Sequence, residues 1–231
     1  MEIGKRAEIF KARSVLRQAL IAHIGRVGIS LDHQQASGDA GTANQEVSFH
    51  MNTPYSIDLH AHRLAAWAAC TAARASKLCR FSVENGTVIL EQAGFTEAFV
   101  LDLLPDAAEA DQVHRQWRDK IIQTANSNAY PFTHGVAAKL LNVYMKVRFV
   151  CGGHHEDPRV AALHPPIDRV LLTTLEKRNF GGHRVRWRSL AAKGWSNFDG
   201  PAYEETIELI RASLPSSTPL WTIEEYWQGY Q

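Results

Sequence analysis

The sequence predicts an all-α protein, a bundle of helices with at most one short β-hairpin near the N-terminus. Three observations lead to this prediction. Most segments repeat apolar residues at the three- and four-residue spacing of a helix face. Several of these segments begin after Ser or Asp, which cap helix N-termini, and end near Gly. Only residues 28–54 alternate apolar and polar side chains in the manner of paired strands.

Composition narrows the class of protein. The 231 residues suffice for a single compact helical unit, or for two lobes of about residues 1–125 and 126–231 that share a cleft. With a net charge of only +1, any DNA-binding surface has to come from local clusters of basic residues. The cysteines form no CxxC pair, and no apolar run approaches the roughly 18 residues that span a bilayer. We therefore expect a cytoplasmic protein, nucleoid-associated if bacterial, without a membrane partner.

The N-terminal segments are predicted in order as a helix, a surface loop with a short hairpin as its alternative, and a second helix. Residues 5–25 carry an apolar stripe typical of an amphipathic helix. Residues 34–46, within the hairpin region, are small and polar, which predicts a mobile loop. Residues 56–77 form an alanine-rich segment capped by Ser56 or Asp58. Because alanine lets neighbouring helices approach closely, this helix is predicted to be central.

Two further helices follow before the middle of the chain. Residues 82–92 begin after the capping residue Ser82 and end before Gly94. Residues 111–125 predict a longer helix with an apolar stripe on one side. Its other face carries His114, Arg115, Arg118 and Lys120. A charged face of this kind is predicted to be solvated.

The middle of the chain holds the candidate active residue. After a tight turn, a helix is predicted over residues 136–150, with Lys139, Asn142 and Lys146 together on one face. A lysine in the first turn of an apolar helix is unusual, because the backbone N–H dipoles there disfavour a cation. That placement and partial burial would lower the pKa of Lys139 and make its neutral amine available as a nucleophile.

The partner of this lysine is predicted at the start of the next helix. A polar loop, residues 151–164, leads through two prolines to Asp168, which can cap a helix ending near residue 177. The loop contains His154, His155 and Asp157, which are metal-ligand residue types. Adjacent histidines rarely face the same way and no second spaced pair accompanies them, so no metal site is predicted.

Two short motifs carry a resemblance to a known family. Gly135-Val136-Ala137-Ala138-Lys139, followed by Pro166-Ile167-Asp168, resembles the helix–hairpin–helix DNA glycosylases, especially the bifunctional 8-oxoguanine glycosylase/lyases. Their pattern is a Gly-Val-Gly-x-Lys hairpin that opens one helix and a Pro-Val-Asp or Pro-Ile-Asp step that opens the next. The resemblance implies that Lys139 is the nucleophile and that Asp168 supports it. We expect the amine and the carboxylate to lie within hydrogen-bond or one-water reach, facing one cleft.

The sequence also departs from this family pattern. Ala137 replaces the second hairpin glycine, and Thr133-His134 stands where Leu-Pro is usual. The separation between the lysine and the aspartate is long, and in this respect the chain resembles the archaeal branch of the 8-oxoguanine glycosylases. The resemblance extends over roughly residues 132–172.

The resemblance implies double-stranded DNA as the partner and no cofactor, and the sequence identifies no protein partner. Hairpin N–H groups suit a phosphate, and the most basic stretch, residues 183–188, adds arginines. The candidate DNA-binding residues are Gly135, Val136, Ala137, Arg184 and Arg186. A flipped base would stack on an aromatic residue, and a C-terminal helix closes the pocket in related enzymes. The candidates for the base pocket are Trp67, Lys146, Trp221 and Trp227.

The sequence therefore favours a DNA N-glycosylase with AP (β-elimination) lyase activity on a damaged or modified base, with 8-oxoguanine the first candidate. Two other functions remain open. One is a non-catalytic helix–hairpin–helix module that binds DNA in a repair or defence assembly. The other is a metal-dependent hydrolase that uses His154, His155 and Asp157. The simplest alternative is that Lys139 is a surface lysine and Asp168 only a helix cap.

Overall fold

The structure, a computed structural model, describes residues 55–74, 76 and 79–229. The described residues all belong to one compact unit, residues 54–231. The predicted helix at 5–25, the possible hairpin at 28–54 and its loop at 34–46 lie outside the described residues.

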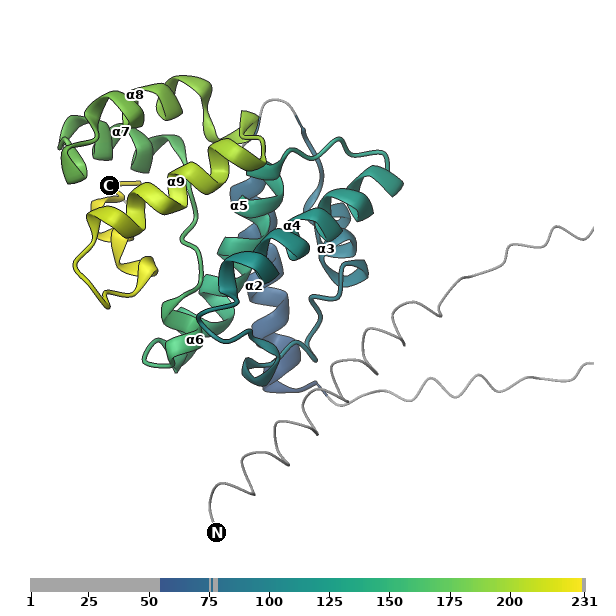
Figure 1. The fold of residues 1–231 in the computed structure, drawn as a ribbon. Helices are drawn as coiled ribbons and strands as arrows, with labels where there is room; N and C mark the ends of the chain where they lie inside the picture. Colours follow the sequence, from purple (N-terminus) through teal and green to yellow (C-terminus); the bar gives the residue numbers. More distant parts are fainter. Residues whose placement is uncertain (1–54, 75, 77–78, 230–231) are drawn as a thin grey trace, which may run out of the picture. The chain divides into compact units, whose positions relative to one another are not determined.

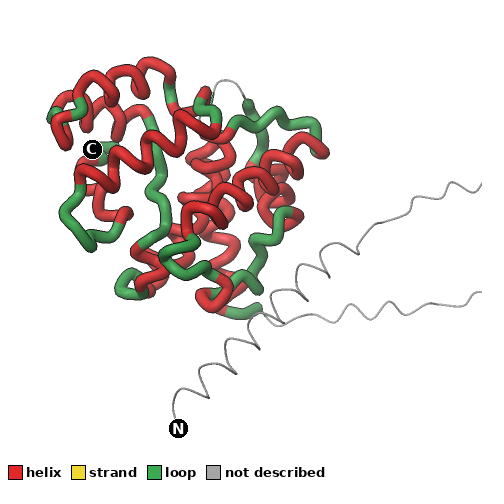
Figure 2. Tube along the Cα trace, viewed as in Figure 1, coloured by secondary structure: helices red, strands yellow, loops and turns green. Residues whose placement is uncertain are grey.

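The described residues are all-α, as predicted, and contain helices and loops without a strand (Figure 2). The α-helices are α2 (Ile57–Ala73), α3 (Val83–Gln92), α4 (Ala110–Ser127), α5 (His134–Met145), α6 (Pro158–Ala161), α7 (Arg169–Lys177), α8 (Arg184–Lys193) and α9 (Gly200–Ser213). Shorter or irregular helices are η1 (Leu101–Leu103), η2 (Lys146–His154), η3 (Phe180–Gly182), η4 (Trp195–Asn197) and η5 (Leu220–Tyr226). None of the described helices combines the length and the apolar character needed to cross a membrane.

The predicted helix starts are set by side-chain caps. Ser56 accepts a hydrogen bond from the N–H of Leu59 at the start of α2, and Ser82 accepts one from Asn85 in α3. Asp168 caps α7 in the same way. Each cap satisfies a backbone N–H that has no partner inside its helix. The cap predictions at these three helices are confirmed.

Helix α5 is the centre of the described unit (Figure 1). It packs against α2, α4, α9 and η4, and every residue from 135 to 142 is buried. The alanines of α2 face it, and Ala65 and Ala69 are fully buried. Small side chains at this contact allow the two helices to approach closely, but α2 is not central as predicted, because its other face is exposed at Ile57, Leu64 and Trp67.

Two hydrophobic clusters fill the interior. One is built mainly from α2, α3, α4 and the inner face of α5, and the other from α7, α8, α9 and η5 together with Ala138. Ile121 and Ala125 of α4 belong to the first cluster along with Leu140 and Leu141 of α5. Packing among the described residues is therefore continuous across residue 125, the boundary in the two-lobe alternative.

One face of α4 differs from the prediction. His114 and Arg118 are buried rather than solvated, and Arg118 is only 1% exposed. The reason is that α9 supplies partners for them: Glu204 accepts a hydrogen bond from Arg118, and the ring of Tyr203 stacks on His114. Only these two residues of the face are buried, and α9 satisfies them in part, because Nε and Nη1 of Arg118 and Nδ1 of His114 have no hydrogen-bond partner among the described residues.

The segment predicted as a polar loop is also partly helical. A π-helix continues α5 from Lys146 to His154, and the short helix α6 follows. The helical path turns at Gly153, whose φ of 90° lies in the left-handed region. Only residues 162–168 cross to α7 without helical structure.

Candidate active site

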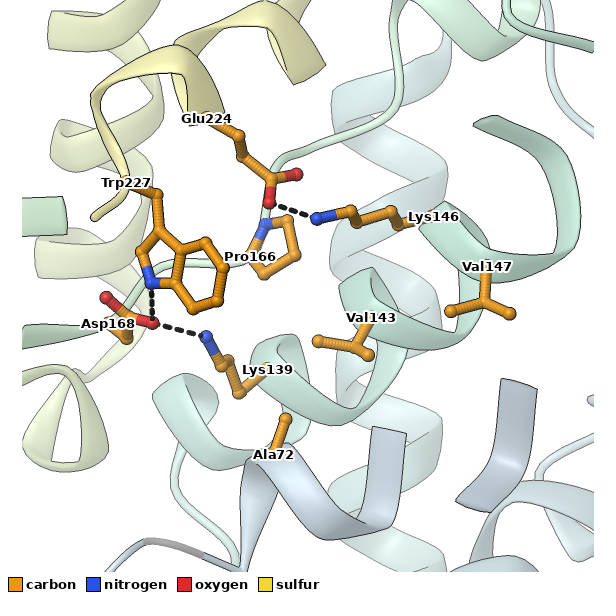
Figure 3. A pocket seen from close by; sticks show the side chains of 9 residues that line it. All are labelled: Ala72, Lys139, Val143, Lys146, Val147, Pro166, Asp168, Glu224 and Trp227. Carbon is orange, nitrogen blue, oxygen red and sulfur yellow. Dashed lines mark hydrogen bonds and ion pairs between the residues drawn. The ribbon is translucent and has the colours of Figure 1, made fainter. Parts of the chain in front are cut away.

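Lys139 and Asp168 form a buried ion pair. The Nζ atom of Lys139 lies 3.2 Å from Oδ2 of Asp168, and Lys139 is 7% exposed (Figure 3). The two residues come from helices α5 and α7, which are separated by η2, α6 and an extended segment. The expected geometry, with amine and carboxylate in hydrogen-bond reach, is confirmed.

The position of Lys139 in its helix differs from the prediction. Thr133 caps α5, because its hydroxyl accepts a hydrogen bond from the N–H of Val136. The helix therefore begins at His134, and Lys139 lies in the second turn rather than the first. The dipole of the helix N-terminus acts mainly within the first turn. Burial, rather than the dipole, is the main influence on this lysine.

Three hydrogen bonds hold the Asp168 carboxylate in place. Its Oδ1 accepts the N–H of Leu171 at 2.9 Å, which is the helix cap. Its Oδ2 accepts from Lys139 and from the indole N–H of Trp227, the latter at 2.8 Å. The carboxylate is thus a cap and an ion-pair partner at the same time, and its orientation toward Lys139 is fixed from both sides.

The charges around Lys139 act in opposite directions. Burial lowers the pKa of Lys139 below its ordinary value, while the carboxylates of Asp168 and Glu224 counteract this effect and Lys146 reinforces it. Burial also raises the pKa of Glu224, with Lys146 opposing the shift. The site therefore favours a neutral amine more than water does, yet keeps a carboxylate beside it.

The ion pair lies in the wall of a pocket of about 190 Å³. Its lining is mostly apolar, with two lysines and two carboxylates, and consists of Ala72, Lys139, Val143, Lys146, Val147, Pro166, Asp168, Glu224 and Trp227 (Figure 3). Lys146 and Glu224 pair with each other across the pocket from Lys139. A concave, largely apolar site with a few convergent polar groups is the usual form of a ligand pocket.

Two of the four predicted base-pocket residues line this pocket. These are Lys146 and Trp227. Trp67 lies on α2, is 56% exposed and is not in the lining. Trp221 lies on η5 with its ring against His155, and it too is outside the lining. Neither Trp67 nor Trp221 is placed to stack on a group bound in this pocket.

The predicted phosphate-binding hairpin is closed off by packing. Gly135, Val136 and Ala137 are buried, and their N–H groups donate to Phe198 and to the side chain and carbonyl of Thr133. None of these N–H groups is free to bind a phosphate in this conformation. This removes the contacts on which both the hairpin prediction and a hairpin-based DNA-binding module depend.

Gly135 instead allows η4 to approach α5. A Cβ at this position would collide with the backbone carbonyl of Trp195. We expect Gly135→Ala to destabilise the protein by about 1–3 kcal/mol, the usual cost of overpacking, in a urea or thermal unfolding experiment. Gly152→Ala is the control, because a Cβ there would meet its neighbours at ordinary contact distances. Equal stability of the two variants would contradict the close approach of η4.

The two predicted DNA-binding arginines differ in their surroundings. Both lie on α8 and are exposed. Arg186 pairs with Glu205 of α9, whereas Arg184 has no ion-pair partner among the described residues. Arg184 is therefore the better candidate for a phosphate contact.

The loop residues considered for a metal site do not converge. His154 and His155 are exposed at the end of η2, and the carboxylate of Asp157 is occupied by the backbone and guanidinium of Arg159. Among the described residues no group of three His, Cys, Asp or Glu side chains is placed to hold a metal ion. The metal-dependent hydrolase receives no support from this part of the chain.

Glu224 is a site residue that the sequence prediction missed. It faces Lys146 inside the pocket, whereas its neighbour Glu225 is exposed. Two adjacent acids in a short aromatic segment give no signal of which one points inward. Pro166 was also missed as a lining residue, although it lies inside the motif that carried the resemblance.

Comparison with known proteins gives no relative: no protein-family model, curated protein or solved structure matches this chain.

Proposed function

We propose that this protein is a DNA N-glycosylase with AP lyase activity, in which Lys139 is the nucleophile and Asp168 supports it. The observation that carries the proposal is the buried Lys139–Asp168 pair in the wall of a pocket, with burial lowering the pKa of the lysine. Perturbed lysines in clefts are frequent nucleophiles, because the neutral amine is the reactive form.

The proposed reaction begins when the neutral Lys139 amine attacks C1′ of a deoxynucleotide. A C–N bond forms, the glycosidic bond breaks, and the base leaves with the bonding electrons and takes up a proton. The sugar ring then opens to a Schiff base with Lys139, and β-elimination expels the 3′ phosphate. The carboxylate of Asp168 is adjacent to the positive charge that develops on the sugar and on nitrogen, and it stabilises that charge.

The pocket provides room and polarity for a flipped base. Its volume is below the range of roughly 300–1,000 Å³ for typical ligand sites, which suits a single ring system better than a whole nucleotide. The Lys146–Glu224 pair offers a donor and an acceptor to the edge of a base, and Trp227 offers an aromatic surface. The location we propose is cytoplasmic, with double-stranded DNA as the partner and 8-oxoguanine as the first substrate to test.

Borohydride trapping tests the proposal. Borohydride reduces a Schiff base to a stable secondary amine, so a reacting protein becomes covalently attached to its DNA. We expect attachment to duplexes that contain an abasic site or 8-oxoguanine, and none to an undamaged duplex of the same sequence. Absence of an adduct with the abasic duplex would contradict the lyase chemistry, whereas an adduct there alone would leave the base unidentified.

Salt dependence tests the proposed DNA surface on α8. Replacing Arg184 by alanine should reduce the slope of log K against log salt by about one unit, because one phosphate contact is lost. Arg186→Ala is the control, since Glu205 already neutralises much of its charge, and it should change the slope less. Unchanged slopes in both variants would place the DNA-binding surface elsewhere.

A further inference from the structure

A network of buried polar side chains lies on the side of α5 that faces α4 and α9. Its centre is Asn142, one helical turn after Lys139 and only 1% exposed. The amide of Asn142 donates to the carbonyl of Pro165 at 2.8 Å and to the hydroxyl of Tyr203 at 2.9 Å. Its oxygen lies 2.7 Å from Nε2 of His114. Asn142 is therefore hydrogen-bonded on both ends of its amide.

The carbonyl of Pro165 fixes the direction of every hydrogen bond in this network. A carbonyl can only accept, so the NH₂ group of Asn142 faces Pro165 and its oxygen faces His114. His114 must then carry its proton on Nε2. Since that nitrogen donates to Asn142, it cannot accept from Tyr203, which lies 3.5 Å away.

His164 extends the network beyond Tyr203. Tyr203 accepts from Asn142, so its proton goes to the other ring in reach, Nδ1 of His164 at 3.1 Å. His164 then carries its proton on Nε2 and donates it to Asp111 at 2.9 Å. Both histidines are neutral in this arrangement, in agreement with the lowering of their pKa values by burial.

The segment that Asn142 holds is the one that carries Asp168. Residues 163–167 are buried yet not helical, so their backbone polar groups cannot pair within a helix. Pro165 and Pro166 have no N–H, so the segment has two fewer buried backbone donors that need a partner. The carbonyl of Pro165 remains, and Asn142 satisfies it.

This bond connects the two halves of the candidate active site. Lys139 and Asn142 share one face of α5 three residues apart, and Pro165 precedes Asp168 by three residues. The Asn142–Pro165 hydrogen bond is therefore a second contact between α5 and the segment that precedes α7, in addition to the Lys139–Asp168 pair. Unlike that pair, it lies outside the pocket, whose lining includes the neighbours Val143 and Pro166 but not Asn142 or Pro165.

We infer that Asn142 is a positioning residue, which sets the register of the Pro165–Asp168 segment against α5 and so places the Asp168 carboxylate beside Lys139. The role of Asn142 in the reaction rests on the proposed glycosylase function, whereas its effect on the position of Asp168 does not. A misplacement of about 1 Å at reacting groups can cost on the order of 10²-fold in rate.

The indole N–H of Trp227 reports the position of Asp168 without any reaction, because it donates to the same carboxylate oxygen as Lys139. Asn142→Ala should shift the indole N–H resonance of Trp227 in a ¹H–¹⁵N spectrum. This resonance is identified by its absence from the spectrum of Trp227→Phe. The control, His114→Phe, also removes a buried hydrogen bond to Asn142 but keeps a ring against His164 and leaves the Pro165 contact intact. It should leave the resonance in place.

The second measurement is the single-turnover rate of borohydride trapping on abasic duplex DNA. Asn142→Ala should slow trapping by about 10- to 100-fold with an unchanged Kd for DNA, and His114→Phe should stay within about threefold of the parent. If Asn142→Ala does not fold, Asn142→Asp replaces it, because it keeps the shape and the contact with His114 while turning the donor to Pro165 into an acceptor.

The outcomes separate the inference from the function on which it rests. An unmoved Trp227 resonance in the Asn142 variant, or equal shifts in the Asn142 and His114 variants, overturns the positioning role. A moved resonance in the Asn142 variant alone supports it, even if the parent protein traps no DNA. In that case the glycosylase proposal fails and the structural role stands.

Discussion

Lys139→Gln should abolish both strand cleavage and borohydride trapping. Glutamine cannot form a Schiff base, so the loss should reach the detection limit rather than a reduced rate. The protein should still fold, because Asp168 keeps its bonds to Leu171 and Trp227 and glutamine can donate to it. DNA affinity should remain within about tenfold of the parent, since Lys139 is buried and makes at most one phosphate contact.

Lys146→Gln is the matched control for this prediction. Lys146 lines the same pocket but pairs with Glu224 rather than with Asp168. Its replacement should preserve trapping on an abasic duplex, at a rate lowered only by the rise in the pKa of Lys139 that follows the loss of a nearby positive charge. Full activity of Lys139→Gln, or equal loss in the two variants, would show that the nucleophile had been assigned to the wrong lysine.

Asp168→Asn should fold and bind DNA but react slowly. Asparagine caps helices about as well as aspartate, so the hydrogen bond from Leu171 is kept. The neutral amide cannot stabilise a developing cation, and the loss of one such electrostatic contact costs on the order of 10²–10³-fold in rate. Asp168→Ala should be equally slow and less stable than Asp168→Asn by about 1 kcal/mol for the lost cap, since both variants leave Lys139 without its counter-charge.

The pH profile of Asp168→Asn gives an independent check. Asp168 raises the pKa of Lys139, so its neutralisation should lower that pKa further. The trapping rate should therefore begin to rise at a lower pH in the variant than in the parent, although its plateau is lower. If Asp168→Asn reacts as fast as the parent with the same profile, Asp168 is a helix cap and nothing more.

Much of the helical framework could be predicted from the sequence, because its signals are local. Ser56, Ser82 and Asp168 cap helices by bonding to N–H groups three residues ahead, which a sequence pattern reveals directly. The Lys139–Asp168 pair was predicted from the resemblance, and the structure brings the two side chains together.

What could not be predicted depends on tertiary partners. The burial of Arg118 requires Glu204, which lies 86 residues further along the chain. The closure of the hairpin at Gly135 requires η4, and a glycine that permits close packing looks the same in sequence as one that admits a phosphate. Residues far apart in sequence decide these features, and local patterns carry no information about them.

The most direct test is to identify the residue that carries the DNA after borohydride trapping on an abasic duplex. Proteolysis and mass spectrometry of the trapped complex should place the reduced sugar on the peptide that contains Lys139, on its side-chain amine. An adduct on Lys146 or on any other amine of the chain, with Lys139 unmodified, would contradict the assignment of Lys139 as the nucleophile.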